Sequence, residues 1–190
     1  IWSMIAADNR YLESNEIERR HLFAEASMRA FQDRGITLFS DGATAVPVTK
    51  LLDQKHLGQL MSNYKPNGHT ALHSSTGQPR TNFENPSATS FLVADKDGLA
   101  IACLISLHNL FGIMAIAEAT GTILETALEQ QGMGPQSLAP MVVLDRASGD
   151  LKMIAAATGG AAAPTALAWT AINVFLENMT LSDAIDGPRM

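Results

Sequence analysis

Apolar and polar residues follow a helical period in the first part of the chain. Five apolar side chains recur near helical spacing within residues 16–34: Leu22, Phe23, Ala26, Ala30 and Phe31. Apolar positions at this spacing form one face of a helix, so the segment is predicted to be an amphipathic helix. Gly35 follows the segment and is expected to end the helix. A shorter helix is predicted from Asp53 to Asn63.

The pattern changes to that of β-strands near residue 88. Residues 89–95 and 99–107 are rich in strand formers, and the Asp97-Gly98 pair between them is a strong turn signal. Residues 140–145 and 151–157 repeat this arrangement, which predicts a second hairpin. Strand 99–107 is apolar at almost every position, so we expect neighbouring layers to cover both of its faces.

A long apolar helix is predicted after the second hairpin. Its body runs from Thr165 to Leu176, and Pro164 lies in its first turn, where a missing N–H group costs nothing. A short last helix is predicted over 181–186 and ends at Gly187-Pro188. Helices, then buried antiparallel hairpins, then a buried helix indicate a layered α+β fold.

A stretch of different composition separates the helical and the hairpin parts. Gly, Pro, Ser, Thr and Asn dominate residues 65–87, and no apolar period continues through them. About 20 residues without regular structure are unusual inside a compact domain. We therefore predict a flexible linker at 65–87, between a helical segment at 1–64 and a segment of hairpins plus helix at 88–190.

Composition narrows the range of partners. The chain has 190 residues and a net charge of −6, which suggests one domain, at most two, and no nucleic-acid partner. No apolar run reaches the roughly 18–20 residues that span a bilayer, so we expect no membrane partner. Cys103 is the single cysteine and is expected to be a small buried hydrophobe. Ile1 is not an initiator methionine, so we expect a processed piece or part of a longer protein.

Two local motifs carry possible chemistry. His69 and His73 are four residues apart, with His56 upstream, but without an acidic or cysteine partner at ligand spacing. We therefore predict no metal and no other cofactor. Gly159 and Gly160 stand between a strand and a helix, where backbone N–H groups can bind an anion. A double glycine is also what a tight strand-to-helix turn needs, so the local sequence leaves both interpretations open.

The junction between linker and first strand reads Ser87-Ala88-Thr89-Ser90. A hydroxyl residue at such a place is usually a turn residue. A loop, a hydroxyl residue and an apolar strand in this order are also what an N-terminal-nucleophile hydrolase needs. Such an enzyme is cut just before a Thr, Ser or Cys that opens a central strand, and the freed amine then acts as the base for that side chain.

An ordered series of motifs runs through almost the whole chain: His21-x-x-x-Glu25-Ala26, Ala30-Phe31-x-Asp33-Arg34, Val46-Pro47-Val48, ATSFLVADKDG at 88–98, Phe111-Gly112, Thr120-Gly121 with Ile123-Leu124, Ser137-Leu138-Ala139-Pro140, Gly159-Gly160, and Ala184 with Pro188-Arg189. In this order they resemble the γ-glutamyltranspeptidase family, also called glutathione hydrolases. The resemblance implies an αββα N-terminal-nucleophile sandwich, incomplete in this chain. It also implies cleavage of a γ-glutamyl or related amide through an acyl-enzyme, with hydrolysis or transfer to an amine.

The resemblance also assigns parts and partners. It implies that 1–64 is the end of the large subunit and that 88–190 belongs to the small subunit. The partners would be the remainder of both subunits and a small γ-glutamyl or acyl-amide substrate, with a homo-oligomer left open. Gly159 and Gly160 would form the oxyanion hole. Family members are often periplasmic or secreted, but no signal is visible in this chain, so no compartment is predicted.

Departures from the family pattern fall on the chemistry. The nucleophile position holds Ala88, which has no hydroxyl, with Thr89 beside it. The implied substrate-binding positions hold Ser106, His108, Gln130 and Ser137. The family has Thr, Asn and an acidic residue at the first three, and Gln136 replaces one serine of a pair at the fourth.

Several interpretations remain open. The protein is a family member that has lost activity and serves as a binding or structural homologue, or an active amidase or acylase that uses Thr89 or Ser87. A slip that made Thr89 the nucleophile would turn every side chain of its strand to the opposite face. An alanine introduced at position 88 to block self-cleavage would not explain His108, Gln130 or Gln136. An unrelated binding module is a further alternative.

Overall fold

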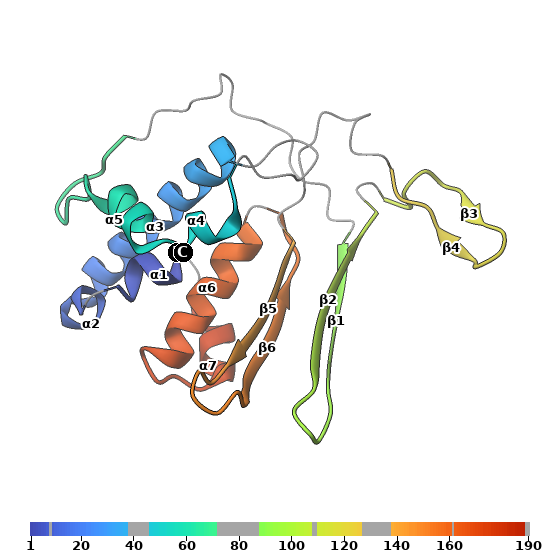
Figure 1. The fold of residues 1–190 in the computed structure, drawn as a ribbon. Coiled ribbons are helices and arrows are strands. Elements are labelled where there is room, and N and C mark those ends of the chain that lie inside the picture. The colour runs from blue at the N-terminus through green and yellow to red at the C-terminus, as the bar shows by residue number, and fades with distance from the viewer. Residues whose placement is uncertain are drawn as a thin grey trace. The chain divides into compact units, whose positions relative to one another are not determined.

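A computed structural model describes residues 1–7, 9–37, 46–71, 88–107, 110–126, 138–160 and 162–188. The chain forms two compact units (Figure 1). The helical unit comprises Ile1–Arg80 and Ala168–Met190, and the hairpin unit comprises Thr81–Leu167. These units are defined by packing, whereas the predicted division at 64 and 88 refers to subunits formed by cleavage. That division stays a prediction.

The helical unit contains the predicted helices. Its elements are α1 (Trp2–Ile5), α2 (Arg10–Glu13), α3 (Glu16–Thr37), α4 (Val48–Leu51), α5 (Gln54–Met61), the second half of α6 (Ala162–Phe175) and α7 (Leu181–Asp186). The predicted helices at 16–34, 53–63, 165–176 and 181–186 are confirmed. No helix in the described part of the chain is long and apolar enough to cross a membrane.

Helix α3 begins with a capping box and ends later than expected. The Glu18 N–H donates to Asn15 Oδ1 at 3.1 Å, and the Asn15 N–H donates to Glu18 Oε2 at 3.0 Å, which satisfies donors at the helix start. The expected stop at Gly35 is wrong, because α3 continues to Thr37. A glycine in a helix costs only about 1 kcal/mol relative to alanine, so it weakens the helix there without ending it.

The core of the helical unit lies where one face of α3 meets α1, α2, α5 and α6. It is formed by Met4, Ile5, Tyr11, Leu22, Phe23, Ala26, Leu57 and Ile172. The Phe23 and Trp169 rings meet edge to face, with centroids 4.9 Å apart, a favourable arrangement for aromatic pairs. The apolar face predicted for residues 16–34 is therefore the face that packs.

The hairpin unit contains both predicted hairpins. Strands β1 (Ala88–Ala94) and β2 (Ala100–Ser106) pair antiparallel, as do β5 (Ala139–Leu144) and β6 (Leu151–Ala157). A small third hairpin joins β3 (Ile116–Ala117) and β4 (Thr122–Ile123). Asp95 Oδ1 accepts the Asp97 and Leu99 N–H groups at 2.9 Å and so closes the first turn. The mixture of helices and small antiparallel sheets confirms the α+β class.

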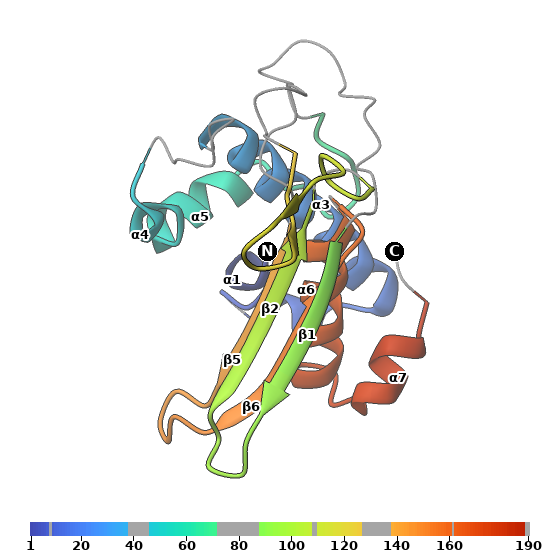
Figure 2. The same cartoon turned by 90° about the vertical axis from the view of Figure 1, so that its right-hand side faces the viewer.

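The two long hairpins lie side by side, as Figures 1 and 2 show, and they form separate two-stranded sheets. Strand β2 contacts both β5 and β6, and β1 contacts β6. The expectation that both faces of 99–107 are covered is wrong for the described residues. Ile101 and Ile105 are about half exposed, at 53% and 49%, while Ala102 and Leu104 on the other face are half-buried. Apolar composition favours burial of both faces, but the face of Ala102 and Leu104 is only partly covered and the face of Ile101 and Ile105 is covered less.

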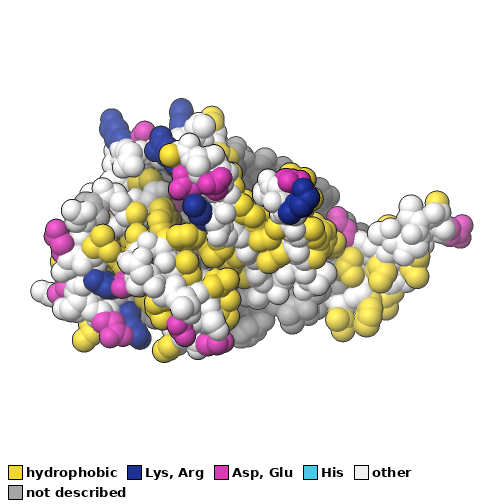
Figure 3. Space-filling view, turned by 90° about the horizontal axis from the view of Figure 1, so that it is seen from below, with side chains coloured by type: hydrophobic (Ala, Val, Ile, Leu, Met, Phe, Trp, Pro, Cys, Tyr) yellow, Lys and Arg dark blue, Asp and Glu magenta, His cyan; other side chains and the backbone are white. Residues whose placement is uncertain are grey.

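Apolar side chains are also exposed around the β3–β4 hairpin (Figure 3). They include Leu110, Phe111, Ile113, Met114, Ile116, Ile123 and Leu124. The hairpin therefore depends on its own backbone geometry more than on side-chain burial.

Candidate active site

The candidate nucleophile position opens β1. Ala88 is the first residue of β1, and its cross-strand partner is Ser106, the last residue of β2. Cross-strand partners point to the same face of a sheet. The structure therefore brings Ala88 and Ser106 together, at the end of the hairpin that lies away from its turn.

Thr89 lies on the opposite face of the hairpin. It pairs with Ile105, and its side chain is exposed. Successive residues of a strand point to opposite faces, so Thr89 shares a face with Phe91 and Val93 rather than with Ala88. A hydroxyl at Thr89 therefore points away from the face that Ala88 and Ser106 share.

Gly159 and Gly160 follow β6 and precede α6. Their φ angles are +132° and +68°, values that side chains rarely tolerate. A Cβ added to Gly159 would meet nothing within 4 Å, so the requirement there is conformational and not one of space. The Gly160 carbonyl accepts the Ala163 N–H at 3.0 Å in the first turn of α6. The double glycine thus turns the chain from a strand into a helix.

These groups share one end of the hairpin unit. Ala157 at the end of β6 pairs with Ala139 at the start of β5, and Gly159 follows two residues later. Figure 1 shows the starts of β1 and β5 at one end of the hairpins and both connecting turns at the other. We call the end with Ala88, Ser106 and Gly159-Gly160 the open end of the hairpin unit. His108, Gln130, Ser137 and the alternative nucleophile Ser87 lie outside the described residues.

The Phe111-Gly112 motif packs against the segment that follows β4. Gly112 has a φ of +57°, and a Cβ placed there would lie 1.9 Å from the Leu124 carbonyl oxygen. The same oxygen accepts the Ile113 N–H at 3.1 Å. Two motifs that are separate in the sequence are therefore in backbone contact, and glycine is required at position 112 on grounds of space and of conformation.

Thr126 is a polar residue at the open end that the sequence did not single out. Its N–H donates to the Leu107 carbonyl at 3.2 Å, next to Ser106. The residue is 6% exposed, and its hydroxyl is buried with no hydrogen-bond partner among the described residues. No local pattern in the sequence marks this position.

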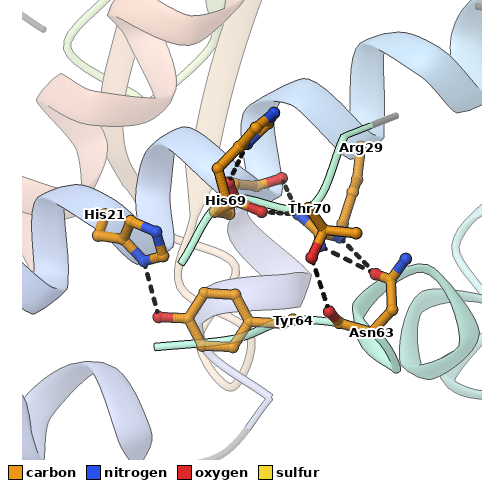
Figure 4. Close-up of polar contacts among 7 residues, drawn as sticks. His21, Arg29, Asn63, Tyr64, His69 and Thr70 are labelled. Atoms are coloured by element: carbon orange, nitrogen blue, oxygen red, sulfur yellow. Dashed lines mark hydrogen bonds and ion pairs between the residues drawn. The ribbon is translucent and has the colours of Figure 1, made fainter. Parts of the chain in front are cut away.

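A second polar cluster lies in the helical unit (Figure 4). Glu25 and Arg29 are one turn apart on α3, both 2% exposed, and form an ion pair. His69 Nδ1 lies 2.8 Å from Glu25 Oε1, and the Arg29 guanidinium donates to Asn63 Oδ1 at 2.9 and 3.2 Å. Burial alone would raise the pKa of Glu25, but hydrogen bonds from Arg29 and His69 outweigh it and hold that pKa below its ordinary value. We call these four residues the Glu25 cluster.

Two of the three histidines that were considered as metal ligands, His56 and His69, contact carboxylates of α3. His69 contacts Glu25, His56 Nε2 lies 3.0 Å from Asp33 Oδ2, and His73 lies outside the described residues. Among the residues the structure describes, no three His, Cys, Asp or Glu side chains are grouped as metal ligands. Residues 65–71, which open the predicted linker, are held on the helical unit by His69 and by Thr70, whose hydroxyl donates to the Asn63 carbonyl at 3.0 Å. Cys103 is half-buried in β2.

Known proteins are similar to this chain over almost its whole length. The profile of the gamma-glutamyltranspeptidase family matches residues 4–190. The glutathione hydrolase proenzyme of Pseudomonas aeruginosa is 31% identical over 130 residues, which cover 68% of this chain and 23% of that protein. That of Pseudomonas sp. (strain A14) is 25% identical over 193 residues, covering 89% of this chain and 33% of that protein. The chain thus spans about a quarter to a third of the length of these relatives.

Solved structures of gamma-glutamyltranspeptidases are similar to part of this chain. The gamma-glutamyltranspeptidase from Pseudomonas nitroreducens complexed with L-DON has a TM-score of 0.43 and 21% sequence identity, and the match covers 53% of this chain and 63% of that chain. An acivicin-inhibited gamma-glutamyltranspeptidase has a TM-score of 0.43 and 22% identity, covering 53% of this chain and 65% of that chain.

Proposed function

The chain belongs to the gamma-glutamyltranspeptidase family, and from this membership we propose that it is a γ-glutamyltranspeptidase-like protein whose acyl-transfer site has lost its nucleophile. One observation carries the proposal. The residue that opens β1, where the family resemblance puts the nucleophile, is Ala88. Covalent acyl transfer needs a hydroxyl or thiol at this place, and a methyl group supplies neither.

What remains of the site supports binding more than bond cleavage. Ser106 shares a face with the nucleophile position, so the Ser106 hydroxyl lies on the same face of the hairpin as the Ala88 methyl group. The positive φ angles of Gly159 and Gly160 at the start of α6 suit backbone N–H groups that bind an anion. The proposed ligand is a small γ-glutamyl or acyl-amide compound, held without an acyl-enzyme.

The proposed fold context is the αββα sandwich of N-terminal-nucleophile hydrolases, incomplete in this chain. Two packed antiparallel hairpins are compatible with the two inner layers of such a sandwich. In this proposal, residues 1–64 belong to the large-subunit part and 88–190 to the small-subunit part, and the remainder of both subunits completes the protein.

An active amidase that uses Thr89 is the competing candidate. Thr89 is exposed and lies one residue from the start of β1, which favours access to its hydroxyl. Its register works against it, because Thr89 and Ser106 point to opposite faces of the hairpin. A shift by one residue would have to break the pairing from Ala88 to Ala94.

The test is the intact mass of the full-length protein together with release of aniline from a γ-glutamyl anilide. We expect one uncut chain and no turnover above a buffer blank. The Thr89→Ala variant is the control, since it removes the competing nucleophile and keeps the strand. Two fragments that divide near residue 88, or turnover that Thr89→Ala abolishes, would establish the amidase and overturn the proposal.

A further inference from the structure

The buried hydroxyl of Thr126 is the polar group at the open end for which the fold provides no role. A threonine hydroxyl can donate one hydrogen bond and accept two. Buried polar groups almost always have a partner, and an orphan costs free energy and needs an explanation. Thr126 Oγ1 has none within the described ranges, although the residue is 94% buried.

The position of Thr126 connects it to the proposed site. Its backbone N–H donates to the Leu107 carbonyl, and Leu107 directly follows Ser106, the partner of Ala88. The backbone of Thr126 is therefore fixed beside the end of β2. Because the main chain is anchored in this way, the hydroxyl has a defined place close to Ser106, which lies on the same face of the hairpin as Ala88.

We propose that Thr126 is a ligand-binding residue, whose hydroxyl donates a hydrogen bond to a carboxylate or amide oxygen of a small acyl-amide ligand at the open end. This inference rests on the proposed function, because it takes the open end to be the ligand site. A hydroxyl that is hidden from water gains more from such a bond than an exposed one.

The second orphan hydroxyl in the described residues supplies a matched control. Ser27 Oγ is also buried and without a partner there, but it lies on α3 in the helical unit. If an orphan hydroxyl were only a defect of packing, Ser27 and Thr126 would respond alike to its removal. If Thr126 binds the ligand, only its removal changes affinity.

The experiment is calorimetric titration of the full-length protein with glutathione and, separately, with L-glutamate, alongside thermal unfolding without ligand. Thr126→Val keeps the shape and removes the hydroxyl, and Thr126→Ser keeps the hydroxyl. We expect Thr126→Val to weaken binding about tenfold, the size of one lost hydrogen bond, with an unchanged or higher unfolding temperature. Thr126→Ser and Ser27→Ala should bind as the unaltered protein does.

Two outcomes would overturn the inference. Unaltered affinity in Thr126→Val would show that the hydroxyl does not touch the ligand. The inference would also fail if the unaltered protein bound neither glutathione nor L-glutamate. A clear fall in the unfolding temperature of Thr126→Val would show that the hydroxyl has a partner in the protein itself. The proposed function fails by a different result, namely turnover or self-cleavage of the unaltered protein.

Discussion

The Glu25 cluster and the open end of the hairpin unit give their buried polar groups different surroundings. In the Glu25 cluster both buried charges are hydrogen-bonded, to each other, to His69 and to Asn63. At the open end of the hairpin unit, Thr126 has a buried hydroxyl without a described partner, and position 88 has no polar group. The difference separates two uses of polar residues. Those of the Glu25 cluster hold the fold together, whereas the Thr126 hydroxyl has no partner among the described residues and, in our proposal, binds a ligand.

The same contrast applies to the family motifs. Glu25 in the first motif and Gly112 in the Phe-Gly motif each have a structural task, in an ion pair and in a backbone contact. Ala88, in contrast, stands at the position that the proposed function assigns to the nucleophile. Motif residues with a structural role are therefore present, whereas the residue proposed to differ is one with a chemical role.

The largest effect is expected from breaking the buried ion pair. Arg29→Met leaves the Glu25 carboxylate buried with His69 as its one remaining partner among the described residues, and removing one partner of a buried pair costs about 3–5 kcal/mol. Chemical denaturation of the unaltered and variant proteins measures the loss. The control is the double variant Glu25→Leu with Arg29→Met, which replaces both charges by apolar groups and should recover most of it. If the double variant were as unstable as the single one, the charges would matter less than the shape they fill.

Gly112→Ala should have the next largest effect, in the hairpin unit. The added methyl would lie 1.9 Å from the Leu124 oxygen at a φ of +57°, so both the backbone and its neighbour must move. We expect a loss of about 2–4 kcal/mol or local unfolding of β3 and β4. Hydrogen exchange of residues 113–124 measures it. Gly121→Ala is the control, because it has a φ of +68° but open space around its Cβ. Equal effects of the two variants would show that conformation alone, and not the contact, makes position 112 a glycine.

Much of the fold was predictable from periodicity, but the site was not. The segment at 16–34 and the two hairpins carry strong patterns, and each formed where expected. The end of α3 at Gly35 was wrong because one unfavourable residue does not outweigh a helix whose neighbours pack. The prediction that both faces of 99–107 are covered was wrong, because an apolar composition favours burial but does not supply a layer that covers each face. The pair of Glu25 and Arg29 at i, i+4 within an apolar face was a readable signal of a buried ion pair. No local pattern marked Thr126, whose backbone bonds to Leu107 just after β2.

A smaller effect is expected from pH, and it tests the Glu25 cluster without a change in shape. The pKa of Glu25 lies below its ordinary value of 4.5, so the folded state favours the ionised carboxylate. Its contribution to stability is therefore present above pH 4.5 and is lost as the pH falls through the folded-state value. The difference in unfolding free energy between the unaltered protein and Glu25→Gln should be constant near neutral pH and shrink on acidification. A difference that stayed constant down to pH 3 would contradict the lowered pKa.

The smallest gain is expected from restoring the hydroxyl at the nucleophile position. Ala88→Thr returns the group that the reaction needs, on the same face as Ser106. Self-cleavage also needs the preceding peptide bond held and polarised, and the family resemblance places further γ-glutamyl-recognising groups at the positions of His108 and Gln130. Catalytic groups act as a unit, so a single repair recovers little of the rate. We therefore expect at most slow self-cleavage, followed on a gel over days, and little turnover of a γ-glutamyl anilide.

Thr89→Ser is the control, because it changes a hydroxyl residue on the other face of the strand and should change neither readout. Robust turnover by Ala88→Thr would show that the rest of the site is intact. The missing hydroxyl at position 88 would then be enough to explain the loss of activity that we propose.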